Sequence, residues 1–319
     1  MKILALLAIL AILAAAGIGV TLYKRTSEPF KAYEAAEQFV TIEPGSSTRT
    51  IGQTLIASGV VRDDLTLRAA LWRTGVARSL KAGEYRFDRP MTTTEVVEKI
   101  GRGDVYERRV TFPEGLTFAD ATPIHNVDPD ARDLEGYLFP ETYSLRRDST
   151  APMLVHTMVA RFEQLFTTDM QQAAEPHGLT PRQVVTLASL VENETAVDAE
   201  RPIVAAVYLN RLKIGMGMQC DPTVIYALQK AGRYNGNLTR ENLQFDSPYN
   251  TYRYAGLPPG PIANPGLASL KAAVAPAEVD YLYFVSRNDG SHVFARTLDE
   301  HNQNVRKFQV EYFRQQRAR

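Results

Sequence analysis

Two glutamates at the end of an apolar run are the residues in this chain best suited to acid–base chemistry. The run begins at Thr180 and has Gln183 three residues later, the spacing of a capping box at a helix N-terminus. Glu192 and Glu194 follow where this helix should end. A carboxyl group held partly out of water has a raised pKa, which a general acid needs near neutral pH. The alternative is a pair of solvated surface acids.

Helical geometry alone does not choose between these two glutamates. At about 100° per residue, the apolar arc of residues 184–191 has Glu192 on one side and Glu194 on the other. Glu194 lies at the border of the apolar face, where it can enter a cleft and stay partly desolvated. Glu192 is the rival, with Arg201 or Arg211 as a pairing partner.

Metal, phosphate and serine chemistry are not predicted. The five histidines are scattered and form no metal-binding pair, so we expect no metal and no cofactor. Residues 215–218 lack the Lys-Ser/Thr of a phosphate-binding loop, and no Gly-x-Ser-x-Gly elbow occurs. The single cysteine, Cys220, excludes an internal disulfide, and we expect it to be a small packed residue.

Length and composition describe a globular chain without an electrostatic preference for nucleic acid. The 319 residues can form a short anchor and two or three compact units, and 45 % of them are hydrophobic. The 36 basic residues balance the 36 acidic ones, so no nucleic-acid partner is predicted.

The N-terminus predicts a membrane anchor. Residues 3–23 carry no charge and are long enough to cross roughly 30 Å of hydrocarbon. A cleaved signal peptide ending near residues 14–16 is the alternative. We expect an uncleaved transmembrane anchor over 1–24, which makes this a single-pass protein of the inner (plasma) membrane with its catalytic part in the periplasm.

The rest of the chain predicts an α+β fold in two parts. A linker over 25–38 leads to a small α+β domain over 39–112, and a catalytic domain fills 113–319. The first has strands at 39–42, 82–87 and 106–112 and helices at 46–58, 63–73 and 95–100. The second has a loop at 113–133, helices at 152–178 and 297–316, irregular structure at 235–265, and a hairpin at Asn288-Asp289-Gly290.

Two further segments have the composition of a sugar-binding site. Residues 249–254 interleave tyrosines with Asn and Arg and lead into the Gly/Pro-rich segment 256–261, so they could stack on sugar rings from a stiff loop. The alternative for this loop is a packed, rigid connector. Asn210 and Arg211 are either a buried hydrogen-bond network or a substrate clamp.

Several motifs resemble one known family. In order, they are LEGYLFPETY, LASLVENET, VYLNRL, GMGMQCDPTVIYAL, SPYNTYRYAGLPPGPIANPG and LYFVSRNDGSHVF. Together they resemble the MltG (YceG-like) family of endolytic murein transglycosylases, from about residue 134 to residue 308. The resemblance implies an N-terminal anchor, a LysM-like unit over 39–112 and a mostly helical, lysozyme-like catalytic domain with a β-hairpin. The family's longer helical insertion between Gly115 and Leu134 is here a short Pro-containing loop, which affects one wall of the cleft.

The resemblance also implies site residues. The family's catalytic glutamate lies in a Glu-x-Glu-Thr motif, which favours Glu194 over Glu192. The candidates for holding the acetamido groups and the lactyl-peptide of the substrate are Asn210, Arg211, Asp221, Tyr249, Asn250 and Tyr252.

The implied reaction cuts the MurNAc-β-1,4-GlcNAc bond of nascent peptidoglycan without water and leaves 1,6-anhydroMurNAc ends. Its role would be to terminate glycan strand elongation. The expected partners are glycan strands, the plasma membrane through the N-terminal helix, and cell-wall synthases. Two other classes stay open: a water-using muramidase, and a non-catalytic, membrane-tethered peptidoglycan-binding scaffold.

Overall fold

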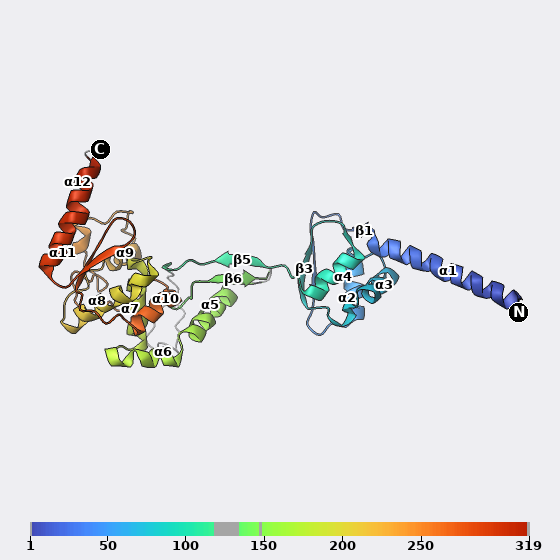
Figure 1. The fold of residues 1–319 in the computed structure, drawn as a ribbon, viewed down its shortest axis with the longest axis horizontal. Coiled ribbons are helices and arrows are strands. Elements are labelled where there is room, and N and C mark those ends of the chain that lie inside the picture. Colours follow the sequence, from blue (N-terminus) through green and yellow to red (C-terminus); the bar gives the residue numbers. More distant parts are fainter. Residues whose placement is uncertain (1, 118–133, 147–148, 318–319) are drawn as a thin grey trace. The chain divides into compact units, whose positions relative to one another are not determined.

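The computed structural model describes residues 2–117, 134–146 and 149–317 (Figure 1). The chain forms two compact units: Met1–Arg109 with Ser144–Ser149, and Val110–Tyr143 with Thr150–Arg319. Both helices and strands occur, so the fold is mixed α and β.

The first unit is built on a two-stranded antiparallel ladder covered by helices. Its elements are α1 (Lys2–Ser27), β1 (Pro29–Phe30), β2 (Gln38–Ile42), α2 (Thr48–Ala57), α3 (Asp64–Thr74), a 3₁₀ turn (Val76–Arg78), β3 (Gly83–Phe87), β4 (Met91–Thr92) and α4 (Thr93–Arg102). In the ladder of β2 with β3, Val40 lies opposite Tyr85, and β1 pairs antiparallel with β4. Alternate residues of β2 and β3 are buried with the apolar faces of α2, α3 and α4. The strands and helices predicted between residues 39 and 102 are therefore confirmed to within a few residues.

The predicted transmembrane anchor over residues 1–24 is wrong. A helix forms there, but the described part of the chain contains no helix with the length and apolar character needed to cross a bilayer. The prediction of single-pass inner-membrane localisation is corrected with it. The last turns of α1 instead pack against α3: Thr26 is buried, Arg73 donates to the hydroxyls of Thr26 and Ser27, and its guanidinium lies 5.0 Å from the ring centre of Tyr23. The anchor prediction rested on the apolar composition of residues 3–23 alone.

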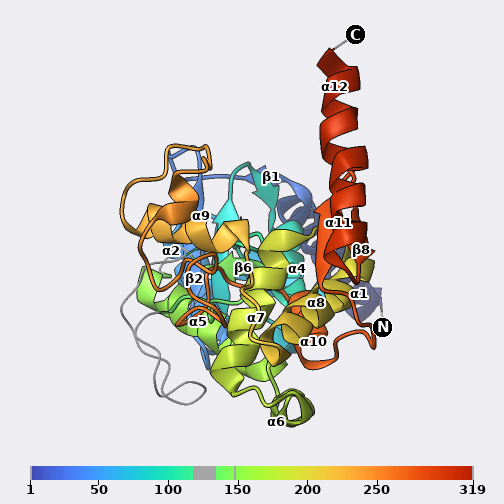
Figure 2. The same cartoon turned by 90° about the vertical axis from the view of Figure 1, so that its left-hand side faces the viewer.

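The second unit is mainly helical. Strand β5 (Arg108–Thr111) pairs with β6 (Thr142–Leu145), and each of these strands has residues in both units. The other elements of the second unit are α5 (Ala151–Leu165), α6 (Thr168–Ala173), α7 (Pro181–Glu194), α8 (Arg201–Lys213), α9 (Asp221–Lys230), α10 (Leu267–Val274), β7 (Tyr283–Ser286), β8 (His292–Ala295), α11 (Leu298–Val305), a π-helical segment (Arg306–Glu311) and α12 (Tyr312–Arg317). Short 3₁₀ turns lie at Glu175–His177, Asp198–Glu200 and Asn242–Gln244. Helix α7 packs against α8, α9 and α10 (Figure 2).

Helix α7 begins and ends as its sequence indicates. The hydroxyl of Thr180 accepts a hydrogen bond from the backbone of Gln183, whose side chain accepts one from the backbone of Thr180. All eight residues from 184 to 191 are buried, so the helix is surrounded on every side except at its ends. Glu194 is the last helical residue, and Thr195 after it is extended, with a φ of −140°.

Three other predictions in this unit can be compared with the structure. The helix predicted over 152–178 is broken, because Thr167 caps a new helix through the backbone N–H of Met170, and a 3₁₀ turn that contains Pro176 follows it. The hairpin is confirmed: β7 and β8 pair antiparallel, and Asn288 has a φ of +66° in the turn. Of the loop predicted over 113–133, the part after residue 117 lies outside the described residues.

Candidate active site

Glu194 lies where α7 ends, facing side chains from α8 and from the start of α9. The Tyr208 hydroxyl donates a hydrogen bond to its Oε2 atom at 3.0 Å, and the Cys220 thiol donates to the same atom at 3.4 Å. Burial raises the pKa of Glu194, and the negative charge of Asp221 adds to this rise. The two hydrogen bonds and the nearby His292 oppose the rise, but the pKa stays above its ordinary value. The surroundings of this side chain therefore favour its protonated form more than water does.

Asp221 and Tyr252 form a second pair beside this acid. The Tyr252 hydroxyl donates to Asp221 Oδ1 at 2.5 Å, and Tyr252 is 37 % exposed. Burial and the bond to Asp221 raise the pKa of Tyr252, and the charge of Glu194 contributes to this rise. Thr251 ties this loop to the start of α9, since its hydroxyl accepts from the backbone N–H of Cys220. The structure thus brings three predicted site residues together: Glu194, Asp221 and Tyr252.

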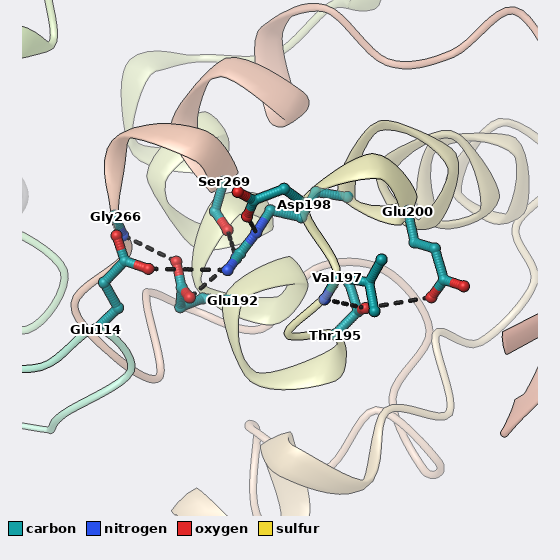
Figure 3. A network of polar contacts seen from close by, with 9 residues as sticks. Glu114, Glu192, Thr195, Val197, Asp198, Glu200, Gly266 and Ser269 are labelled. Atoms are coloured by element: carbon teal, nitrogen blue, oxygen red, sulfur yellow. Dashed lines mark hydrogen bonds and ion pairs between the residues drawn. The ribbon is translucent and has the colours of Figure 1, made fainter. Parts of the chain in front are cut away.

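Glu192 is engaged in a buried ion pair. Its Oε1 atom lies 2.9 Å from Arg201, and its Oε2 atom accepts a hydrogen bond from the backbone N–H of Gly266 at 2.9 Å (Figure 3). Its side chain is 4 % exposed and that of Arg201 is 6 % exposed. Arg201 also contacts Asp198 and, at 3.7 Å, Glu114. Both oxygens of Glu192 are therefore bound to neighbouring groups of the protein.

Glu114 is a second carboxyl group in this network. It lies beside Glu192 in Figure 3, and burial together with the charge of Glu192 raises its pKa, which Arg201 partly offsets. A side chain at Gly266 would collide with Glu114, since an added Cβ would meet the carboxylate. The glycine therefore leaves room for the Glu114 carboxylate at the start of α10.

A third set of contacts connects the end of α7 to the hairpin. Thr195 donates from its hydroxyl to Glu200 Oε2 at 3.2 Å (Figure 3), and the backbone N–H of His292 donates to Glu200 Oε1 at 2.8 Å. The His292 Nδ1 atom lies 2.7 Å from Glu200 Oε2. Burial alone raises the pKa of Glu200, but the hydrogen bonds from His292 and Thr195 outweigh it and lower that pKa.

Asn210 and Arg211 hold backbone carbonyls. The Asn210 amide donates to the carbonyl oxygens of Val279 and Tyr281, at 2.8 and 3.1 Å. The Arg211 guanidinium is buried and donates to the carbonyls of Leu282, Gly217 and Met218. The sequence left open whether Asn210 and Arg211 form a buried hydrogen-bond network or a substrate clamp. These contacts are those of a hydrogen-bond network.

The remaining two predicted residues are parts of the loop framework. Asn250 is fully buried; its amide donates to the carbonyls of Leu243 and Phe245, and its Oδ1 atom accepts from the backbone of Tyr252. Tyr249 packs on Tyr226, with ring centres 4.9 Å apart. These contacts stiffen the loop that carries Tyr252.

Sequence reasoning missed Tyr208, Cys220 and His292. Cys220 is buried as predicted, but its thiol also contacts Glu194. Tyr208 lies within α8, where its local sequence resembles an ordinary apolar helix. Its place in the VYLNRL motif was the signal that could have pointed to a role. Within the described ranges, no group of His, Cys, Asp and Glu side chains is arranged to hold a metal ion.

The geometry by itself defines an acid–base site at the end of a buried helix. The sequence pattern of the YceG-like family matches residues 40–307. The chain therefore belongs to the YceG-like family.

Characterised relatives and one solved structure agree with this assignment. The endolytic murein transglycosylase of Bacillus subtilis is 30 % identical over 91 % of this chain and 90 % of its own length. That of Streptococcus pneumoniae D39 is 27 % identical over 95 % of this chain, which spans 64 % of that relative's length. A crystal structure of a yceG-like protein from Listeria monocytogenes is 29 % identical, with a TM-score of 0.55 over 84 % of this chain and 98 % of the other.

Proposed function

We infer that this chain is an endolytic murein transglycosylase, a lyase acting on peptidoglycan, and that Glu194 is its catalytic acid. The activity is supported by the name shared by the Bacillus and Streptococcus relatives. One observation carries the residue assignment. Glu194 has a raised pKa, and no donor in the described part of the chain reaches its second oxygen, whereas both oxygens of Glu192 are bound within the protein.

The first step of the proposed reaction breaks the bond between MurNAc and GlcNAc. Protonated Glu194 donates its proton to the glycosidic oxygen, and the bond from that oxygen to the anomeric carbon breaks. The 2-acetamido oxygen of MurNAc attacks the anomeric carbon and forms an oxazolinium ring. No second protein carboxylate is required, in contrast to the paired carboxylates of most glycosidases.

The second step closes the anhydro ring. The C6 hydroxyl of the same sugar attacks the anomeric carbon while ionised Glu194 accepts its proton. The bond to the acetamido oxygen breaks, the acetamide is restored, and Glu194 is protonated again. Glu194 thus serves first as acid and then as base, and water is neither consumed nor released.

We propose that Asp221 and Tyr252 contact the substrate, and that the more buried predicted residues support the loops around it. Tyr252 and Asp221 are accessible beside the acid, so they are placed to meet a sugar ring and its hydroxyl or amide groups. Asn210, Arg211 and Asn250 act on the substrate through the loops they hold, and Tyr249 stiffens the loop of Tyr252.

The unit over 39–112 is proposed as a LysM-like glycan-binding domain preceding a catalytic domain over 113–319. A cavity of about 400 Å³ lies at one end of the β2–β3 ladder, lined among others by Thr41, Glu43 and Arg146. Its polar side chains, which stand among apolar ones, suit hydroxyl and amide groups of a glycan. Cleavage within strands would then terminate growing glycan chains.

Mass spectrometry of the fragments released from purified sacculi tests this reaction class. Non-hydrolytic cleavage predicts 1,6-anhydroMurNAc ends, each one water lighter than a reducing end. Fragments with reducing ends alone would instead identify a water-using muramidase. A chain that binds sacculi and releases nothing would be a glycan-binding scaffold.

A further inference from the structure

Two hydrogen-bond donors converge on one oxygen of Glu194. Tyr208 of α8 and Cys220 at the start of α9 both donate to Oε2, and both are 1 % exposed. No donor from the described residues reaches Oε1. The two oxygens of this carboxyl group therefore have different surroundings.

We propose that Tyr208 and Cys220 are positioning residues, which hold Oε2 of Glu194 as a hydrogen-bond acceptor and so place its transferable proton on Oε1. This inference rests on the proposed role of Glu194 as the acid. It adds which oxygen carries the proton, and which side chains decide it.

The physical reason is the difference in basicity between the two oxygens. An oxygen that already accepts two hydrogen bonds binds a proton less readily than one that accepts none. Both donors keep their own protons, because burial raises the pKa of the Tyr208 hydroxyl and of the Cys220 thiol. The two hydrogen bonds to Oε2 also restrict rotation of the carboxyl group. The Oε1 atom of Glu194 is therefore held in one orientation.

Each donor is itself fixed by its surroundings. The ring of Tyr208 packs edge-on against Phe284 of β7, with ring centres 6.1 Å apart at 83°. The backbone N–H of Cys220 donates to the Thr251 hydroxyl, which also contacts the hydroxyl of Thr223. The orientation of Glu194 is therefore set by α8, α9, the hairpin and the loop of Tyr252 together.

Other charged and titratable groups act on Glu194 without touching it. Asp221 of α9 raises its pKa and His292 of β8 lowers it, while Arg211 of α8 and Tyr252 interact with its charge. These four groups are unchanged when Tyr208 or Cys220 is replaced. A change in the pH dependence of such a variant therefore reports the loss of the hydrogen-bond donor.

The test compares kcat and the pH profile of kcat/KM on purified sacculi for Tyr208→Phe, Cys220→Ala and the double variant. Each donor favours the ionised form, so its removal raises the pKa of Glu194. The pH at which kcat/KM falls should then move up by roughly half to one unit in Tyr208→Phe. The kcat below that pH should drop about 3- to 10-fold, because the proton is shared between both oxygens and the carboxyl group rotates. Cys220→Ala should show the same changes to a smaller degree, since a thiol is a weak donor.

Two controls separate positioning from structural damage. Cys220→Ser restores a donor of similar size and should recover most of the loss seen in Cys220→Ala. Tyr143→Phe removes another buried hydroxyl, which donates to the Phe139 carbonyl, and should leave the pH profile and kcat unchanged. A double variant with unchanged kcat and an unchanged profile would overturn the inference. If Glu194→Gln is inactive in the same assay, that result leaves the proposed function intact; an active Glu194→Gln would remove both.

Discussion

The carboxylate of Glu192 lies 2.9 Å from the guanidinium of Arg201, and both side chains are almost completely buried. Two residues further on, the described residues that donate hydrogen bonds to Glu194 do so through a neutral hydroxyl and a neutral thiol. The two acids that a helical wheel leaves equivalent therefore have different physical roles. One neutralises a buried cation, and burial raises the pKa of the other.

Glu192→Gln should destabilise the protein. It leaves Arg201 buried without its closest anion, and breaking a buried ion pair costs about 3–5 kcal/mol. Urea denaturation at neutral pH measures this loss. Glu175→Gln is the matched control, because Glu175 is exposed and the change should stay within about 0.5 kcal/mol. An unchanged midpoint for Glu192→Gln would show that the ion pair adds nothing to stability.

Asp221→Asn should shift the pH dependence of activity downward. The negative charge of Asp221 contributes to the raised pKa of Glu194, so its removal lowers that pKa. Glu194 then loses its proton at a lower pH, so kcat/KM should begin to fall at a lower pH than in the wild type. Asp246→Asn, which alters a different loop contact with Tyr254, serves as control. A shift toward higher pH in Asp221→Asn would contradict the electrostatic account.

Glu200→Gln should remove a pH-dependent part of the stability. The folded state lowers the pKa of Glu200, so its contribution is present above the unfolded value of about 4.3 and is lost as pH falls through the folded-state pKa. Melting temperatures of wild type and variant should therefore converge as the pH is taken below about 4. Parallel curves over the whole range would mean that the contacts of Glu200 with His292 and Thr195 carry no net stability.

Asn210→Ala should affect stability and leave substrate affinity nearly unchanged. Its amide donates to two partly buried backbone carbonyls, and acceptors left unsatisfied there cost up to about 1–3 kcal/mol. We expect a lower melting temperature with KM within about two-fold of wild type, because the effect acts on folding and not on contacts with the sugar. A large rise in KM at unchanged stability would return Asn210 to the substrate clamp.

Local signals made much of the fold predictable. The capping box of Thr180 and Gln183, the apolar periodicity of residues 184–191 and the turn at Asn288 each depend on neighbours in sequence. The prediction of one continuous helix over 152–178 was wrong. It followed the amphipathic pattern and ignored Thr167, which caps the start of a new helix. The transmembrane prediction rested on the composition of residues 3–23, and it is overturned because the described residues include no helix long and apolar enough to cross a bilayer.

The site was predictable only in part, for a different reason. Glu192 and Glu194 differ through partners 9 to 74 residues away, such as Arg201, Gly266 and Cys220, which no local pattern brings together. The motif resemblance favoured Glu194 without giving the cause. For Asn210, Arg211 and Asn250, residue type suggested sugar contacts, and only the structure places their polar atoms on backbone carbonyls.

The most direct test of the central claim is product release from purified sacculi by Glu194→Gln, with Glu175→Gln as the matched control. General acid catalysis contributes about 10²- to 10⁴-fold, so anhydro-ended fragments should fall by at least a hundred-fold in Glu194→Gln and stay at wild-type level in the control. The loss should occur without unfolding: the raised pKa means that an ionised Glu194 lowers stability at neutral pH, so the neutral glutamine should melt no earlier than wild type. A folded Glu194→Gln protein that still releases anhydro-ended fragments at the wild-type rate would contradict the assignment.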